Sequence, residues 1–141
     1  EDVQVVYPVH MSPAVREIAN EILGDNKRVH LIEPLEVFDF HNFAANSYMI
    51  LTDSGGVQEE APSLGKPVLV LRDTTERPEG IAAGTLKLAG TEEETIYSLA
   101  KELLEDKEAY EAMAKASNPY GDGHASQRIV KALLDFLQKS K

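Results

Sequence analysis

The sequence predicts an α/β fold with a Rossmann-like, doubly wound parallel sheet, and three observations lead to this prediction. Short runs rich in Val, Ile, Leu and Tyr alternate with stretches of helical periodicity along the 141 residues. At least two of these runs are apolar without alternation, as strands of a buried parallel sheet tend to be. No repeat, low-complexity stretch or linker interrupts the pattern. Strand–helix alternation of this kind implies one domain, residues 1–141, with helices on both faces of its sheet.

Five strands are expected, each a short run that is rich in apolar residues. They are Val3–Tyr7, Val29–Ile32, Tyr48–Leu51, Val68–Leu71 and Thr85–Leu88. In an open α/β sheet, ligands bind outside the carboxyl ends of the strands. We therefore expect a site in the loops that follow Ile32, Leu51 and Leu71.

The first helix is predicted to begin after Ser12, with Pro13 in its first position and Gly24 at its end. Its residues follow helical periodicity and make one apolar face, which comprises Val15, Ile18, Ala19 and Ile22.

Further helices complete the alternation. One is expected over residues 35–45, and a short one from Gly55 to Pro62, which must kink or end it. A third follows a capping box of Thr91 and Glu94. The last two are expected over 107–116 and from Ala125 onward. The helix behind the capping box should turn four apolar residues inward, namely Ile96, Leu99, Ala100 and Leu103. The last helix should bury five, namely Ile129, Val130, Leu133, Leu134 and Leu137.

Composition and charge exclude several classes of protein. The chain is 43% hydrophobic and 27% charged, as globular proteins are, and it has neither a transmembrane-length apolar run nor a signal-peptide pattern. It has no cysteine, which rules out disulfides, thiolate nucleophiles and Cys-ligated zinc and fits a cytoplasmic protein. The net charge of −10 disfavours nucleic acid as a partner. Because residue 1 is Glu and a strand-like run begins at Val3, we expect a cut inside a longer protein.

The segment after the third strand, D-S-G-G-V-Q-E-E-A-P (53–62), has the features of an anion site. Gly55 and Gly56 let a ligand approach the backbone closely and permit a positive φ. The helix that follows offers free N–H groups and the positive end of its dipole, and Ser54 adds a hydroxyl. The alternative is a tight strand-to-helix turn with a Ser or Asp cap. The absence of G-K-[ST] and G-x-S-x-G patterns argues against a Walker loop and a serine nucleophile.

Charged residues near this segment are candidates for nucleotide contacts. Glu59 and Glu60 could accept hydrogen bonds from a ribose diol, or be helix-start glutamates favoured by the dipole. The two project about 100° apart, so at most one should face a ligand. In R-D-T-T-E-R-P-E-G (72–80), Arg72 or Arg77 could pair with a phosphate, or neutralise carboxylates in a solvated loop.

The histidines show no metal-binding pattern. The spacings of His10, His30, His41 and His124 match no ligand motif, so no metal is expected. His10 follows the first strand at its carboxyl end, a position that faces a ligand in some folds but is more often structural for a lone histidine. The segment N-P-Y-G-D-G (118–123) is interpreted as a turn-rich loop.

Four segments together resemble the bacterial non-hydrolysing UDP-N-acetylglucosamine 2-epimerases: 53–67, 72–80, 118–123 and Y-P-V-H (7–10). The resemblance runs over essentially the whole chain. It implies the C-terminal Rossmann-like domain of a two-domain enzyme with the glycosyltransferase-B arrangement, whose active site lies between the domains. The N-terminal domain would be absent from this chain.

The resemblance also implies an activity. The full enzyme is an isomerase that interconverts UDP-N-acetylglucosamine and UDP-N-acetylmannosamine by anti elimination of UDP and its re-addition, and the product feeds cell-wall and surface polysaccharide synthesis. No cofactor, nucleic acid or membrane is implied, and the full-length protein would be a homodimer.

The same resemblance implies roles for individual residues. Ser54, Gly55 and Gly56 would bind the diphosphate, Glu60 the ribose and Arg77 the nucleotide. Phe40 and the backbone of Leu35 would contact the base, and His10 would belong to a regulatory UDP-N-acetylglucosamine site. The acid and base groups would belong to the missing half, so no catalytic residue is expected here and the chain alone should be inactive.

Other functions remain open at this point. A UDP-sugar glycosyltransferase or a hydrolysing epimerase of the same architecture would also place UDP on glycines and a glutamate. A stand-alone nucleotide-sugar binding module is a further alternative, because fold alone does not determine function.

Overall fold

The computed structural model describes residues 3–139 and confirms an α/β fold with parallel sheets. Within this range five strands form, and all their pairings are parallel. They lie in two sheets and not in one continuous sheet: β1 (Val5–Pro8) with β2 (Val29–Ile32), and β3 (Ile50–Thr52), β4 (Val68–Val70) and β5 (Leu86–Leu88) with β4 in the centre. The chain divides between Phe43 and Ala44 into two compact units, and each unit holds one sheet.

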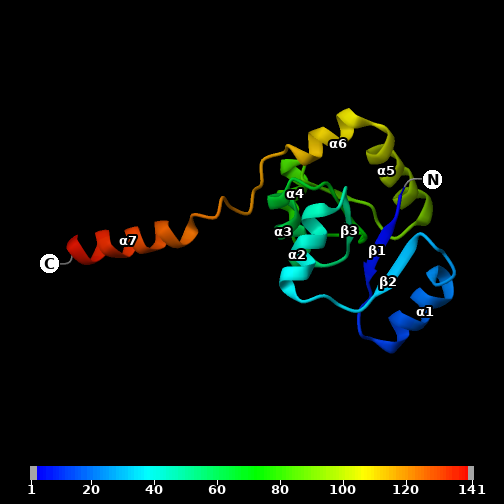
Figure 1. The fold of residues 1–141 in the computed structure, drawn as a ribbon. Coiled ribbons are helices and arrows are strands. Elements are labelled where there is room, and N and C mark those ends of the chain that lie inside the picture. The colour runs from blue at the N-terminus through cyan, green and yellow to red at the C-terminus, as the bar shows by residue number, and fades with distance from the viewer. Residues whose placement is uncertain (1–2, 140–141) are drawn as a thin grey trace. The chain divides into compact units, whose positions relative to one another are not determined.

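The N-terminal unit contains β1, α1 (Pro13–Leu23), β2 and the start of α2 (Val37–Asn46). β1 and β2 lie side by side in parallel, and α1 connects them (Figure 1). Pro13 opens α1 as predicted, because the N–H that proline lacks would have no partner in the first turn. Gly24 ends the helix, and its N–H donates to the Asn20 carbonyl oxygen at 2.9 Å.

β4 is the centre of the second unit because its residues alternate between two core clusters. Val68 and Val70 belong to one cluster and Leu69 to the other, as the two-residue period of a strand requires. The first cluster is covered by α3 (Gly55–Glu60) and the 3-10 helix that follows it (Ala61–Leu64), and the second by α5 (Glu93–Glu105). All of β4 is fully buried, which explains its apolar sequence without alternation.

The inward face of α5 is confirmed, but its predicted capping box is wrong. Leu103 is buried, and three partly buried residues pack against the same cluster: Ile96, Leu99 and Ala100. The N-cap is Glu92 and not Thr91, and no side chain caps the helix. Because the helix begins one residue later than predicted, Glu94 is not three residues beyond the N-cap, and the reciprocal bonds of a capping box cannot form.

α4 (Pro78–Ala83) begins within the segment 72–80, which follows the fourth strand and for which a solvated loop was one of the two interpretations. Pro78 stands in the first turn, and Gly84 ends the helix with a left-handed backbone, φ 81°. Both are ordinary helix boundary signals, but a helix of six residues is too short to show a period of apolar residues. The helix after α5 is α6 (Lys107–Ala114), which is close to its predicted bounds.

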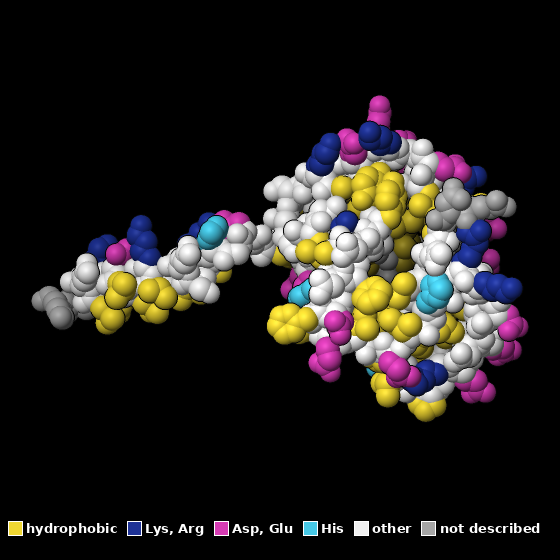
Figure 2. All heavy atoms as spheres, viewed as in Figure 1, with side chains coloured by type: hydrophobic (Ala, Val, Ile, Leu, Met, Phe, Trp, Pro, Cys, Tyr) yellow, Lys and Arg dark blue, Asp and Glu magenta, His cyan; other side chains and the backbone are white. Residues whose placement is uncertain are grey.

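Two predicted apolar faces are not buried. In α1 only Ala19 is buried, while Ile18 and Ile22 remain exposed. In α7 (Ala125–Lys139) the five residues predicted to be buried are 54% to 59% exposed, namely Ile129, Val130, Leu133, Leu134 and Leu137. Figure 2 shows apolar side chains along one side of α7 and charged ones along the other. The predicted burial of the α7 face is therefore wrong, because helical spacing of apolar residues shows that a helix has an apolar face and not that this chain covers it.

None of the helices formed by residues 3–139 combines the length and the apolar character needed to cross a bilayer.

Replacing Gly80 with alanine is expected to lower the free energy of unfolding by about 1–3 kcal/mol, because an added methyl group overpacks the site. A Cβ at Gly80 would lie 2.4 Å from both Leu86 Cδ1 and the Tyr120 hydroxyl oxygen. Leu86 is buried against β4 and has little room to move. Urea denaturation measures the effect, with Gly56→Ala as the control, because Gly56 is also helical and a Cβ there would meet nothing closer than Ser54 Oγ at 4.0 Å. An equal effect of both substitutions would contradict the prediction.

Candidate functional site

The turn between β3 and α3 has the geometry of an open loop and not of a side-chain cap. Ser54 is the N-cap residue of α3, but its side chain makes no capping hydrogen bond. The Ser54 N–H instead donates to Thr52 Oγ1 at 3.0 Å, which holds the turn against the end of β3. The alternative of a turn capped by the Ser54 side chain is therefore wrong. The Ser54 hydroxyl is exposed and makes no hydrogen bond to the start of the helix.

The glycine pair keeps the start of α3 unobstructed. A Cβ at Gly55 would meet Glu76 Oε1 at 3.8 Å and Arg77 Nη2 at 3.9 Å, and nothing closer. Neither Gly55 nor Gly56 has a positive φ, so the conformational freedom predicted for them is not used. Their contribution is the open space beside the backbone, which lets another group approach the N–H groups closely.

Arg77 is held at the start of α4 with its guanidinium beside Gly55. Its backbone N–H donates to Thr75 Oγ1 at 3.0 Å, its Nε pairs with Glu59, and its Nη1 donates to the Glu76 carbonyl oxygen at 3.1 Å. The side chain is 31% exposed, so solvent and ligands can reach it. A guanidinium fixed in this way presents further N–H donors in a planar fork, which suits a phosphate group.

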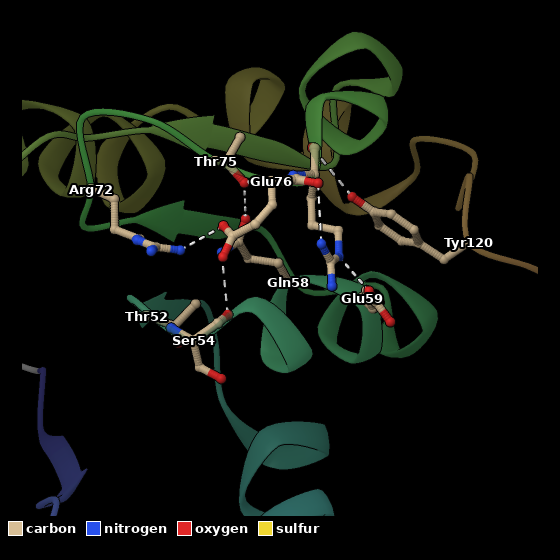
Figure 3. Close-up of polar contacts among 9 residues, drawn as sticks. Thr52, Ser54, Gln58, Glu59, Arg72, Thr75, Glu76 and Tyr120 are labelled. Carbon is tan, nitrogen blue, oxygen red and sulfur yellow. Dashed lines mark hydrogen bonds and ion pairs between the residues drawn. The ribbon is translucent and has the colours of Figure 1, made fainter.

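Arg72 occupies a different position in the same segment. Its Nη1 donates to Glu76 Oε2 at 2.6 Å (Figure 3). This hydrogen bond holds the pKa of the Glu76 carboxyl below its ordinary value, so the pair stays charged at neutral pH. Both arginines thus neutralise carboxylates, as the alternative interpretation proposed, but Arg77 is the one whose guanidinium lies beside Gly55.

Glu59 and Glu60 are distinguished by Arg77. Glu59, the neighbour of the predicted ribose-binding residue, forms the ion pair with the Arg77 guanidinium. Glu60 is more exposed, and because it is the next residue of α3, its side chain projects about 100° away from that of Glu59. The role of Glu59 as the partner of Arg77 was missed by sequence reasoning, because an i to i+18 pair leaves no periodic signal.

The sequence analysis also did not identify Gln58 and Thr75, which connect the turn at Ser54 with the segment that carries Arg77. Gln58 is fully buried, which is unusual for a primary amide. Its Nε2 donates to the Ser54 carbonyl oxygen at 3.2 Å, and its Oε1 accepts from Thr75 Oγ1 (Figure 3). The available signal was a glutamine within the apolar spacing of α3, where a leucine or valine would be the ordinary choice.

The segment 118–123 is more than a connecting loop, because Tyr120 contacts α4. Its hydroxyl lies 3.5 Å from the Arg77 carbonyl oxygen and against Gly80. The Tyr120 N–H donates to Asn118 Oδ1 at 3.1 Å, which fixes the turn that carries the ring. Burial raises the pKa of the Tyr120 hydroxyl, so it stays protonated and available as a donor.

The remaining predicted residues lie in the N-terminal unit. Leu35 precedes α2 and Phe40 lies within it, and both are half-buried. His10 is exposed after β1, where its Nδ1 accepts a hydrogen bond from the Ser12 N–H at 3.1 Å. Among residues 3–139 no group of three or more potential ligands could hold a metal ion.

Comparison with known sequences relates the chain to one family. Residues 1–134 match the sequence profile described as UDP-N-acetylglucosamine 2-epimerase. The chain is 76% identical over 134 residues to the UDP-N-acetylglucosamine 2-epimerase of Bacillus subtilis (strain 168), and 56% identical over 133 residues to that of Escherichia coli (strain K12). The matches cover 95% and 94% of this chain but 35% of each relative, so the chain spans about a third of their length.

Solved structures of similar proteins agree with the sequence match. The S. aureus MnaA–UDP structure superposes with a TM-score of 0.90 at 60% identity, covering 97% of this chain and 38% of that one. The UDP-GlcNAc 2-epimerase of Neisseria meningitidis bound to UDP-GlcNAc superposes with a TM-score of 0.86 at 54% identity, covering 94% and 36%.

Proposed function

Because the chain belongs to the UDP-N-acetylglucosamine 2-epimerase family, we propose that it is the UDP-binding, C-terminal domain of an enzyme that interconverts UDP-N-acetylglucosamine and UDP-N-acetylmannosamine. The observation that carries this proposal is the placement of the Arg77 guanidinium beside the unobstructed backbone of Gly55. A diphosphate in this space would meet a fixed positive charge and backbone N–H donors together. The relatives solved with UDP and with UDP-GlcNAc support the choice of ligand.

The proposed role of this site is to stabilise the leaving group. When UDP is eliminated from the sugar, negative charge grows on the diphosphate. Donors that are already in place stabilise such charge without reorganising during the reaction. The hydrogen bonds that Arg77 donates to Thr75 and to Glu59 fix it before any ligand arrives, which is the preorganisation that this effect requires. The net charge of −10 makes this local positive group necessary for attracting an anion.

Other residues complete the proposed nucleotide site. Ser54 would donate its hydroxyl to the diphosphate, and Glu60 would accept hydrogen bonds from the ribose. The base would contact Phe40 and the backbone of Leu35, and His10 would belong to a separate regulatory site for UDP-N-acetylglucosamine. The full-length enzyme is proposed to act as a homodimer.

We expect the 141 residues alone to bind UDP and to form no epimerised product. Moving the C2 proton needs an acid and a base within hydrogen-bond reach of the sugar, and these groups are proposed to lie in the remainder of the enzyme. Calorimetry with UDP and proton NMR with UDP-N-acetylglucosamine measure the two properties on one sample. Heat of binding without product supports the proposal. Product from this chain alone would refute the placement of the acid and base, and the absence of any UDP binding would refute the function.

Proton NMR on the full-length protein separates the proposed reaction from its relatives. UDP-N-acetylmannosamine as the product identifies the non-hydrolysing epimerase. Free N-acetylmannosamine with UDP would identify a hydrolysing epimerase, and a sugar transferred to an added acceptor would identify a glycosyltransferase. Either of the last two results would replace the proposed reaction while leaving the UDP site in place.

A further inference from the structure

A continuous relay of hydrogen bonds joins the turn at Ser54 to the backbone of Arg77. The Arg77 N–H donates to Thr75 Oγ1 at 3.0 Å, and the Thr75 hydroxyl donates to Gln58 Oε1. Gln58 Nε2 then donates to the Ser54 carbonyl oxygen at 3.2 Å. Figure 3 shows Thr75, Gln58 and Ser54 in sequence between the β3–α3 turn and the segment that leads into α4.

The direction of this relay is determined by its two ends. The Thr75 Oγ1 accepts a hydrogen bond from the Arg77 N–H, so the hydroxyl of Thr75 uses its own hydrogen to donate onward. The Ser54 carbonyl can only accept, so the Gln58 amide must turn its NH₂ group toward Ser54 and its oxygen toward Thr75. The opposite amide orientation would place two acceptors against each other. The side chains therefore have one satisfied arrangement.

Burial makes this arrangement costly to break. Gln58 is fully buried, and a buried amide that loses its partners keeps the full cost of leaving water. An apolar side chain in the same place would pack in the core without fixing either neighbouring loop. The sheet itself ends at Thr52 and Val70, so the pairing of β3 with β4 does not extend to Ser54 or Arg77. The relay is thus a direct polar link between the two loops.

We propose that Gln58 and Thr75 are positioning residues that hold the Ser54–Gly56 turn and Arg77 at the separation that a diphosphate requires. This inference rests on the proposed UDP site. The Ser54–Gly56 turn and Arg77 come from different loops. A change of about 1 Å in the distance between them is enough to weaken the binding of a diphosphate that contacts both. Neither residue contacts the diphosphate in this scheme; both act through Ser54 and Arg77.

The test compares Thr75→Val with Thr75→Ser in the full-length protein that contains this sequence. Valine removes the hydroxyl while keeping the shape, and serine keeps the hydroxyl. We expect Thr75→Val to weaken UDP binding about tenfold, as the loss of about one buried hydrogen bond would, and Thr75→Ser to restore most of it. Uridine, which has no phosphate, should bind both variants within about twofold of the unsubstituted protein, because groups outside its contacts act independently. Calorimetry, with competition for the weaker ligand, gives both affinities.

Thr85→Val is the matched control. Thr85 is buried, whereas Thr75 is half-buried, and the Thr85 hydroxyl donates a hydrogen bond to the Gly80 carbonyl oxygen at 3.2 Å. The same atoms are exchanged, but Thr85 takes no part in the link between Ser54 and Arg77. Its substitution should leave the ratio of UDP to uridine affinity unchanged even if the protein melts at a lower temperature.

A second substitution tests whether the two residues act as one unit. Gln58→Leu should reduce the ratio of UDP to uridine affinity as Thr75→Val does. The double variant should lose little more than either single variant, because one missing hydrogen bond already interrupts the relay between Ser54 and Arg77.

The outcomes separate this inference from the function on which it rests. If the unsubstituted protein binds UDP and Thr75→Val binds it equally well, the inference is overturned and the proposed function stands. Equal losses of UDP and uridine affinity in Thr75→Val would also overturn it, because they indicate a general structural role. No UDP binding by the unsubstituted protein would overturn both.

Discussion

Arg77→Ala should weaken UDP binding about a hundredfold, the effect of losing charge-assisted hydrogen bonds of about 2.7 kcal/mol in total. The guanidinium is fixed beside Gly55 by bonds to Glu59 and to the Glu76 carbonyl, so it has little entropy to lose when the diphosphate arrives. Its removal also leaves the Glu59 carboxylate without its partner near an incoming anion. Both consequences reduce affinity, and calorimetry with UDP measures them together.

Arg72→Ala is the control for this prediction. Arg72 lies in the same segment and pairs with Glu76 on the surface, and exposed pairs of this kind contribute little. We expect its UDP affinity to stay within about threefold of the unsubstituted protein. Arg77→Lys should recover only part of the loss, because an ammonium group keeps the charge but not the planar fork. A larger effect at Arg72 than at Arg77 would show that the nucleotide is assigned to the wrong arginine.

Glu59→Gln separates the two contributions to the Arg77 effect. In this background Arg77→Ala removes the guanidinium without exposing an unpaired carboxylate to the ligand. The loss of UDP affinity should then be smaller than in the single variant, and the difference measures the repulsion from Glu59. An unchanged loss would mean that Glu59 does not influence the anion.

The fold could be predicted from the sequence wherever local pattern and burial agree. β4 is apolar throughout because both its faces and both its edges are covered, and α5 shows a clean inward face that ends at Leu103. The exposed face of α7 shows the limit of this reasoning. Its apolar spacing is as regular as that of α5, yet the residues stay exposed, since periodicity carries no information about which surface a helix packs against.

The candidate site was predictable in its backbone but not in its side-chain partners. The glycine pair and the two arginines stand out because they follow two parallel strands at their carboxyl ends, where ligands bind in open α/β sheets. The pairing of Arg77 with Glu59 and the hydrogen bond of Thr75 to Gln58 join residues of α3 to residues 17 or 18 positions later, in the segment before α4. Such contacts depend on how β3 and β4 align, and this register is a tertiary property.

Leu103→Ala should lower the free energy of unfolding by about 2–5 kcal/mol, whereas Leu104→Ala should lower it by less than about 1 kcal/mol. The two leucines are neighbours in α5, so helix propensity changes equally in both variants and cancels from the comparison. Leu103 is 1% exposed and packs with Leu69 and Ala89, so its truncation leaves a cavity that the paired strand beneath it cannot fill. Leu104 is 42% exposed, and its truncation removes contact without opening a cavity. Urea denaturation measures both values, and similar losses in the two variants would show that the cluster around Leu69 is not the core of this unit.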